Sequence, residues 1–128
     1  MAVQVTTVML GVEDVARSKQ FYGEGLGCTI AQDHQTFVLF DLGEGSSSLA
    51  LYEREAAAED AGVSSKGSGF RGVSLHYIVD SRDEVDAVMA QAVQAGASVV
   101  QEVAATQWGC CGYFSDPDGY LWKVATGG

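Results

Sequence analysis

The chain has 128 residues, a length that fits one compact domain, and its 47% hydrophobic and 19% charged residues are typical of a packed globular protein. Seven Lys and Arg against 17 Asp and Glu give a net charge of −10, which argues against nucleic acid or an anionic membrane surface as partners. No stretch approaches the roughly 20 apolar residues that span a bilayer, and the N-terminus shows no targeting signal. The three cysteines, two of them adjacent, indicate free thiols in a reducing cytoplasm.

The first half of the chain predicts a strand, a helix and three further strands. Residues 13–18 open the helix, and Gly27 suits the position just after its end. One face of this helix is expected to be buried through Val15, Ser18, Phe21 and Tyr22. The expected strands cover residues 3–12, 28–31, 36–42 and 47–52. A short Ala- and Glu-rich helix at 53–61 and a Ser- and Gly-rich linker at 63–69 follow.

The second half repeats this order. A strand at 73–79 precedes a helix at 82–95, which Gly96 ends. The apolar face expected for this helix consists of Val85, Val88, Met89, Ala92 and Val93. Strands are predicted at 97–103, 112–115 and 120–125. The sequence Asp116-Pro117-Asp118-Gly119 predicts a tight turn between the last two.

The two halves align with each other, which indicates an internal duplication. Residues 7–12 followed by Glu13-Asp14 match residues 74–79 followed by Asp80-Ser81, and the helices that follow differ in spacing by two residues. We therefore predict an α+β fold with two βαβββ modules, about 1–62 and 69–126, within a single domain at 1–128. Each module alone would leave an apolar sheet face unburied, so the modules are expected to pair around a concave cleft.

Several motifs resemble the vicinal oxygen chelate superfamily of glyoxalases, extradiol dioxygenases, fosfomycin-modifying enzymes and bleomycin-resistance proteins. LGVEDVARSKQFY at 10–22, followed by Leu26-Gly27, resembles the first module of that superfamily. YFSDPDGYLW at 113–122, preceded by Trp108-Gly109, resembles the end of the second module. LALYERE at 49–55 and WGCCGYF at 108–114 are similar to a glyoxalase-like branch. The likeness covers nearly the whole chain and implies U-shaped mixed sheets around a cleft.

The resemblance also implies where a metal would bind. Metal-using relatives carry ligands, typically His and Glu or Gln, at four strand positions, which correspond here to Thr7, Ala50, Ser74 and Lys123. Alanine cannot coordinate a metal, and lysine brings a positive charge to the place of the cation. We therefore expect no metal, no other cofactor and no catalytic residue. The resemblance then favours metal-free members, which bind a toxic molecule without altering it.

Strand alternation from these four positions predicts which other side chains face the cleft. The mixture of rings, small residues and a few polar groups is typical of a site for an organic molecule. Trp108 is expected in a loop at the same edge, and Leu121 shares the inward phase. Phe114 and Trp122, in the opposite phase, are assigned to the core. The predicted ligand-binding residues are Thr7, Met9, Ser48, Ala50, Tyr52, Ser74, His76, Trp108, Cys111, Tyr113 and Lys123.

The leading hypothesis is metal-independent binding and sequestration of an aromatic or polycyclic small molecule, such as an antibiotic, by a cytoplasmic self-protection protein. The resemblance implies a homodimer. One alternative is a glyoxalase-like lyase or isomerase, or a dioxygenase-type enzyme, with an unorthodox metal site. Another is an interaction module with a collapsed pocket. The side chains available to an unorthodox site are His34, Glu53, His76 and Glu102.

Overall fold

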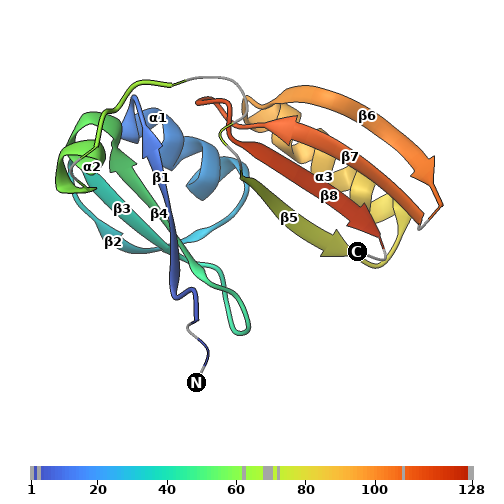
Figure 1. Ribbon diagram of the computed structural model, residues 1–128. Helices are drawn as coiled ribbons and strands as arrows, with labels where there is room; N and C mark the ends of the chain where they lie inside the picture. Colours follow the sequence, from blue (N-terminus) through green and yellow to red (C-terminus); the bar gives the residue numbers. More distant parts are fainter. Residues whose placement is uncertain are drawn as a thin grey trace. The chain divides into compact units, whose positions relative to one another are not determined.

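A computed structural model describes residues 2, 4–61, 63–67, 71, 73–107 and 109–126. The chain divides into two compact units, Met1–Lys66 and Gly67–Gly128. Among the described residues, each unit contains one four-stranded mixed sheet (Figure 1). The predicted α+β fold with two βαβββ modules is confirmed.

The first unit forms a sheet in the order β1-β4-β3-β2. Strand β1 runs parallel to β4, whereas β3 is antiparallel to both of its neighbours. Helix α1 continues directly into a short π-helix, η1. The elements are β1 (Thr7–Val12), α1 (Val15–Gln20), η1 (Phe21–Gly25), β2 (Thr29–Asp33), β3 (Phe37–Asp41), β4 (Ser48–Glu53) and α2 (Arg54–Ala61).

The second unit repeats this topology in the order β5-β8-β7-β6, with β5 parallel to β8. Strand β6 reaches Thr106 and β7 begins at Gly109, both beyond the predicted ends, because these two residues remain paired. The elements are β5 (Ser74–Val79), α3 (Arg82–Ala95), β6 (Ser98–Thr106), β7 (Gly109–Ser115) and β8 (Leu121–Thr126).

Local signals explain where the two main helices begin and end. The Asp14 carboxylate accepts a hydrogen bond from the Arg17 amide at 3.1 Å and caps α1, and the Ser81 hydroxyl caps α3 in the same way. Gly96 has a φ of 116°, a left-handed conformation that glycine adopts without strain, and it ends α3. Helix α1 therefore begins at Val15, two residues after the expected opening at residue 13, and α3 begins at Arg82 as predicted.

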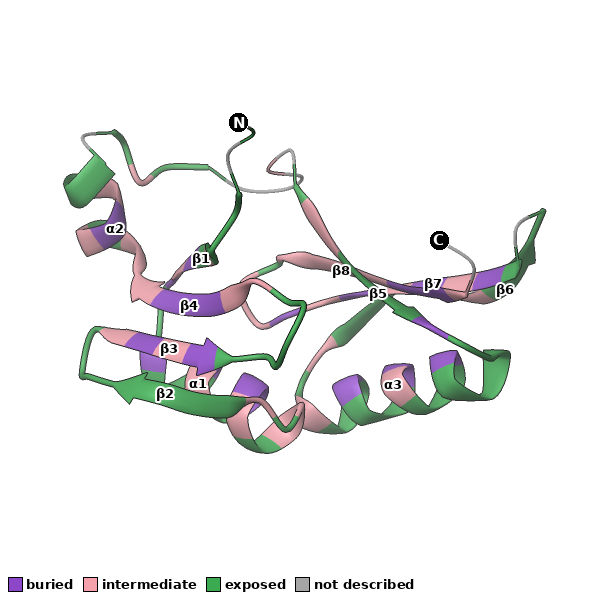
Figure 2. Ribbon diagram, turned by 90° about the horizontal axis from the view of Figure 1, so that it is seen from below, coloured by how far each residue is buried: buried purple, intermediate pink, exposed green. Residues whose placement is uncertain are grey.

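Each sheet packs one face against the helix of its own unit. In the first unit α1 lies on β3 and β4, and all four residues predicted for its buried face are buried. In the second unit α3 lies on β6, β7 and β8 through Val85, Met89 and Ala92, whose buried positions recur along one side of the helix (Figure 2).

The prediction for Val93 was wrong, since this side chain is 45% exposed. On an ideal helix Val93 lies about 80° around the axis from Val85, at the edge of the stripe that Met89 and Ala92 continue. The buried face of α3 is therefore narrower than the apolar pattern suggested.

Candidate functional site

Each sheet also has a face that points away from α1 or α3, which we call its distal face. Residues that are direct partners on neighbouring strands share a face. In the first sheet, Thr7 pairs with Ser48 and Met9 with Ala50, while the alternate residues Leu10 and Leu49 are buried with α1. The first distal face therefore consists of Thr7, Met9, Gly11, Thr29, Gln32, Phe37, Leu39, Asp41, Ser48, Ala50 and Tyr52.

The first distal face is apolar or weakly polar except for Asp41 at the end of β3. Met9 is 45% exposed, Tyr52 is half-buried, and Ala50 is buried in the middle of the sheet. The Tyr52 ring meets the Phe37 ring edge-on, with centroids 5.7 Å apart. Helix α2 begins beside one end of this face. The first residue of α2 is close to Gly11, since a Cβ on Gly11 would lie 3.6 Å from Arg54 Cα. This surface offers rings and a thioether, and the one charged group among its paired residues is the Asp41 carboxylate.

The second distal face contains the remaining predicted residues that the structure describes. His76 pairs with Lys123 across β5 and β8, and Lys123 pairs with Tyr113 across β8 and β7. The face is formed by Ser74, His76, Ile78, Cys111, Tyr113, Ser115, Leu121, Lys123 and Ala125. Trp108 lies outside the described residues.

The assignment of Phe114 and Trp122 to the core agrees with their position on the opposite, helix-covered side. Phe114 is 1% exposed and Trp122 is half-buried. Their rings stack with centroids 6.0 Å apart and planes 4° from parallel. Alternation along β7 and β8 thus separates core residues from distal ones.

A polar row crosses the second distal face from His76 through Lys123 to Tyr113. A 2.9 Å hydrogen bond joins His76 Nε2 to the Ser74 hydroxyl, two residues earlier on the same strand. Within the described part of the chain, neither the Lys123 ammonium nor the Tyr113 hydroxyl has a hydrogen-bond or ion-pair partner. The row therefore presents donors without a matching acceptor.

The residues at the four metal-ligand positions do not fit a divalent cation. Ala50 has no donor atom, and the Lys123 ammonium has no free electron pair and carries the charge of the ion it would bind. This leaves the hydroxyls of Thr7 and Ser74, which are poor ligands compared with imidazole and carboxylate. No group of three or more His, Cys, Asp or Glu is placed to hold a metal anywhere in the described ranges.

The side chains available to an unorthodox metal site do not gather. The Glu53 carboxylate accepts hydrogen bonds from the amides of Glu55 and Ala56, at 3.0 and 3.1 Å, and so caps the start of α2. His34 is exposed between β2 and β3, and Glu102 is exposed on β6. Only His76 belongs to the second distal face, where its hydrogen bond goes to Ser74.

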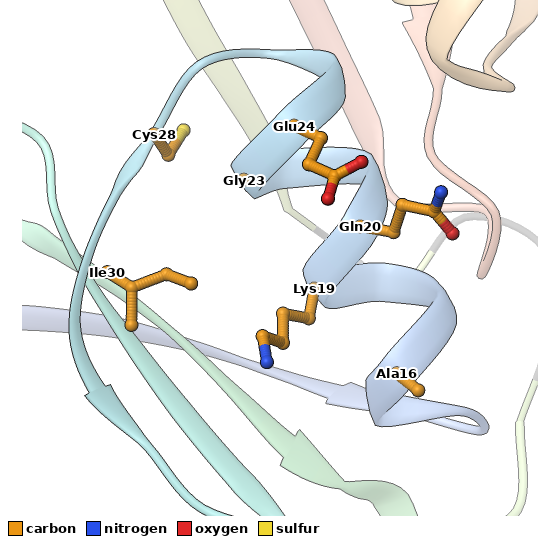
Figure 3. A pocket seen from close by; sticks show the side chains of 7 residues that line it. All are labelled: Ala16, Lys19, Gln20, Gly23, Glu24, Cys28 and Ile30. Atoms are coloured by element: carbon orange, nitrogen blue, oxygen red, sulfur yellow. The ribbon is translucent and has the colours of Figure 1, made fainter.

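A cavity of about 500 Å³ that was not predicted from the sequence lies between α1, η1 and the start of β2 (Figure 3). The sequence signal that could have indicated this cavity is the pair of glycines, Gly23 and Gly25. Both lie in the π-helix, and π-turns widen a helix and are common near functional sites. The cavity is lined by Ala16, Lys19, Gln20, Gly23, Glu24, Cys28 and Ile30.

In this cavity, the charge of Lys19 is already paired and the thiol of Cys28 is protonated. Lys19 Nζ lies 2.6 Å from Asp33 Oδ2, so its charge is already paired. Burial raises the pKa of the Cys28 thiol, which keeps the thiol protonated and poorly nucleophilic at neutral pH. The lining contains no aromatic ring on which a planar ligand would stack.

The described helices include none with both the length and the apolar character needed to cross a bilayer. The longest of them, α3, has 14 residues.

Comparisons with known proteins agree with the fold. The family model of the Glyoxalase/Bleomycin resistance protein/Dioxygenase superfamily matches residues 4–124. A glyoxalase-related enzyme from Fulvimarina pelagi is 30% identical, with 96% of this chain and 87% of that chain covered and a TM-score of 0.85. Comparison with curated proteins gives no match.

Two further solved structures share the fold at lower identity. A glyoxalase/bleomycin resistance protein/dioxygenase family enzyme from Burkholderia phytofirmans is 20% identical over 98% of this chain and 99% of that one, with a TM-score of 0.85. Lactoylglutathione lyase from Agrobacterium tumefaciens is 17% identical over 98% and 95%, with a TM-score of 0.70.

Proposed function

Because the chain belongs to the Glyoxalase/Bleomycin resistance protein/Dioxygenase superfamily, we propose that it binds an aromatic or polycyclic small molecule without a metal ion and leaves that molecule unchanged. The superfamily name covers both enzymes and resistance proteins, so membership alone does not choose between them. The choice comes from the side chains of this chain.

The observation that carries the proposal is the donor set at the four positions where metal-using relatives have their ligands. An enzyme of this kind needs its ion as a Lewis acid and as a template for the substrate. Thr7, Ala50, Ser74 and Lys123 offer no imidazole and no carboxylate. The same positions still belong to sheet faces that combine rings with small and polar side chains, which supports binding over metal-dependent catalysis.

The ligand class follows from the side chains on the distal faces. Tyr52 on the first face and Tyr113 on the second are half-buried, so part of each ring remains accessible. Stacking on such a ring contributes about 0.5–1.5 kcal/mol beyond the burial of area. Met9 adds a polarizable thioether that adapts to flat surfaces. These features support an aromatic or polycyclic ligand.

The proposed role is sequestration in the cytoplasm by a homodimer, which would protect a cell against a toxic compound such as an antibiotic. A bound compound cannot reach its target while the protein is in excess and the Kd lies below the free concentration of the compound. No chemical step is required for this protection.

The direct test uses protein purified without chelator. Metal content is measured by elemental mass spectrometry, and a panel of polycyclic aromatic antibiotics is titrated by quenching of tryptophan fluorescence. We expect saturable binding that is unchanged by EDTA, and mass spectrometry of the recovered compound should give its original mass. A stoichiometric divalent ion together with a chemically altered compound would overturn the proposal.

An activity assay with added metal ions decides the enzymatic alternative. The Fulvimarina pelagi relative at 30% identity is described as a glyoxalase-related enzyme. If this chain has a similar activity, adding Zn²⁺, Ni²⁺ or Mn²⁺ to the apoprotein must produce turnover of an α-oxoaldehyde thiol adduct. Absence of turnover with all three ions, alongside metal-free binding of an aromatic compound, supports the binding role.

A further inference from the structure

We propose that the ligand is an anion, an aromatic carboxylate or phenolate, and that Lys123 on the second distal face binds its acidic group. This inference rests on the proposed function and specifies the class of molecule that the site accepts. The inference depends on the surroundings of the Lys123 side chain and not on the net charge of the chain, which is negative.

Lys123 lies in the interior of the second sheet, because β8 has β5 on one side and β7 on the other. Its neighbours on the distal face are known from the strand register, and none of them is a carboxylate. They are His76 and Tyr113 beside it, Leu121 and Ala125 along the strand, and Ser74, Ile78, Cys111 and Ser115 on the diagonals. Neighbours directly across the strands lie about 4.5–5.5 Å apart at Cβ, within reach of the lysine side chain.

The position of Lys123 differs from that of two other cationic side chains, Lys19 and Arg54, which both have acceptors. The Lys19 ammonium is paired with Asp33 at 2.6 Å, and the Arg54 guanidinium donates to the Ser65 carbonyl at 2.6 Å. Lys123 is half-buried and has no acceptor among the described residues, in a chain with 17 acidic side chains available. A partly desolvated ammonium without a counter-ion is unfavourable, so an anionic ligand supplies the missing partner.

The residues on either side of Lys123 complete a set of donors. The Tyr113 hydroxyl is without a partner in the described part of the chain, and the only side-chain hydrogen bond that His76 makes there joins Nε2 to the Ser74 hydroxyl. A carboxylate or phenolate oxygen at the lysine can therefore accept a second hydrogen bond from Tyr113 or from His76 Nδ1 in its protonated tautomer. The ring that carries the oxygen can then stack against the half-buried Tyr113 ring.

The first distal face does not share this property. Its paired residues include no lysine or arginine, and the one charged side chain among them is the Asp41 carboxylate. Selection for an acidic group is therefore assigned to the second unit and to one residue in it.

The test compares three matched probes by isothermal titration calorimetry: 2-naphthoate, the neutral 2-naphthamide and the cationic 2-naphthylmethylammonium. We expect naphthoate to bind at least about tenfold more tightly than naphthamide, since charge-assisted hydrogen bonds are roughly twice as strong as neutral ones. The ammonium probe should bind most weakly. In Lys123→Met the preference for naphthoate should disappear while the affinity for naphthamide stays within twofold.

Two variants serve as controls. Lys66→Met removes the same charge from an exposed residue outside the helices and strands and should leave the preference intact, and Lys123→Arg should preserve it. Circular dichroism establishes that each variant is folded, and Lys123→Gln replaces the methionine variant if that variant is not.

The outcomes separate the two proposals. If naphthamide and naphthoate bind equally well, the inference is wrong and the proposed function stands. A preference for naphthoate that survives Lys123→Met, or that falls equally in Lys66→Met, also overturns the inference. If none of the probes binds and the panel of antibiotics fails as well, the proposed function is lost together with the inference.

Discussion

Strands β7 and β8 carry two faces of different character, although the residues alternate along the same backbone. On the helix-covered face, Phe114, Val124 and Gly112 pack beneath α3 and are buried. On the distal face, Tyr113 and Lys123 are half-buried and have no polar partner in the described ranges. The first set therefore determines the fold, whereas the second is free to carry binding chemistry.

The largest effect that separates the two faces is expected for neighbouring aromatic residues on β7. Phe114→Ala should lower the free energy of unfolding by about 3–5 kcal/mol, because it leaves a cavity beside Trp122 and beneath α3. Tyr113→Phe should change it by less than about 0.5 kcal/mol, because the hydroxyl has no partner in the described residues. Urea denaturation followed by circular dichroism measures both values.

Equal destabilisation of the two variants would contradict this difference between the faces. Tyr113 would then be a core residue, and the distal face of β7 would have a structural role like that of the other face.

A smaller effect is expected when a side chain is added to each face. A Cβ on Gly112 would lie 3.0 Å from Val103 Cγ2 and 3.2 Å from Met89 Cε, so Gly112→Val should overpack the core and cost about 1–3 kcal/mol. Cys111→Val replaces the thiol of the half-buried distal residue next to it by the same branched side chain and should cost less than about 1 kcal/mol. Thermal denaturation of the pair gives the difference, and a larger loss for the Cys111 variant would reverse our assignment of the faces.

The smallest effect concerns Cys28, in the cavity that we do not assign to the ligand. Burial raises the pKa of this thiol, so the folded protein retains its proton near pH 8.5, where an unfolded cysteine is about half ionised. Alkylation of Cys28 by iodoacetamide should be slower in the folded protein than in urea at that pH. The difference should narrow as the pH rises through the pKa of the folded state.

Peptide mass spectrometry resolves Cys28 from the other cysteines. The same shift means that the unfolded state ionises first, so the contribution of Cys28 to stability is present below the pKa of the unfolded thiol and declines as the pH rises. Equal alkylation rates in the folded and unfolded chains would show that the cavity leaves the thiol in contact with water.

Much of the fold could be predicted because it depends on local signals. Asp14 and Ser81 mark the helix starts through their capping side chains, and Gly96 marks the end of α3. The period of two in the strands assigned Tyr113 and Phe114 to opposite faces, since a residue and its successor cannot share a face of a regular strand.

Other features depend on tertiary structure and were not predicted. The π-helix forms because the Leu26 amide donates to the Phe21 carbonyl at 2.9 Å, and nothing in the local sequence requires this spacing. The register shifts between β6 and β7 and the cavity at Cys28 arise from packing. For the candidate site, alternation predicted which residues share a face, but not that Lys123 would lack an acceptor, which depends on the strand register.

The most direct test of the account is a map of backbone amide chemical shifts with saturating 2-naphthoate and no added metal. We expect the largest changes in β5, β7 and β8, around His76, Tyr113 and Lys123, and the same map in the presence of EDTA. Changes concentrated instead at α1, η1 and β2 would assign the ligand to the cavity beside Cys28. That result would contradict the claim that the distal faces bind the ligand.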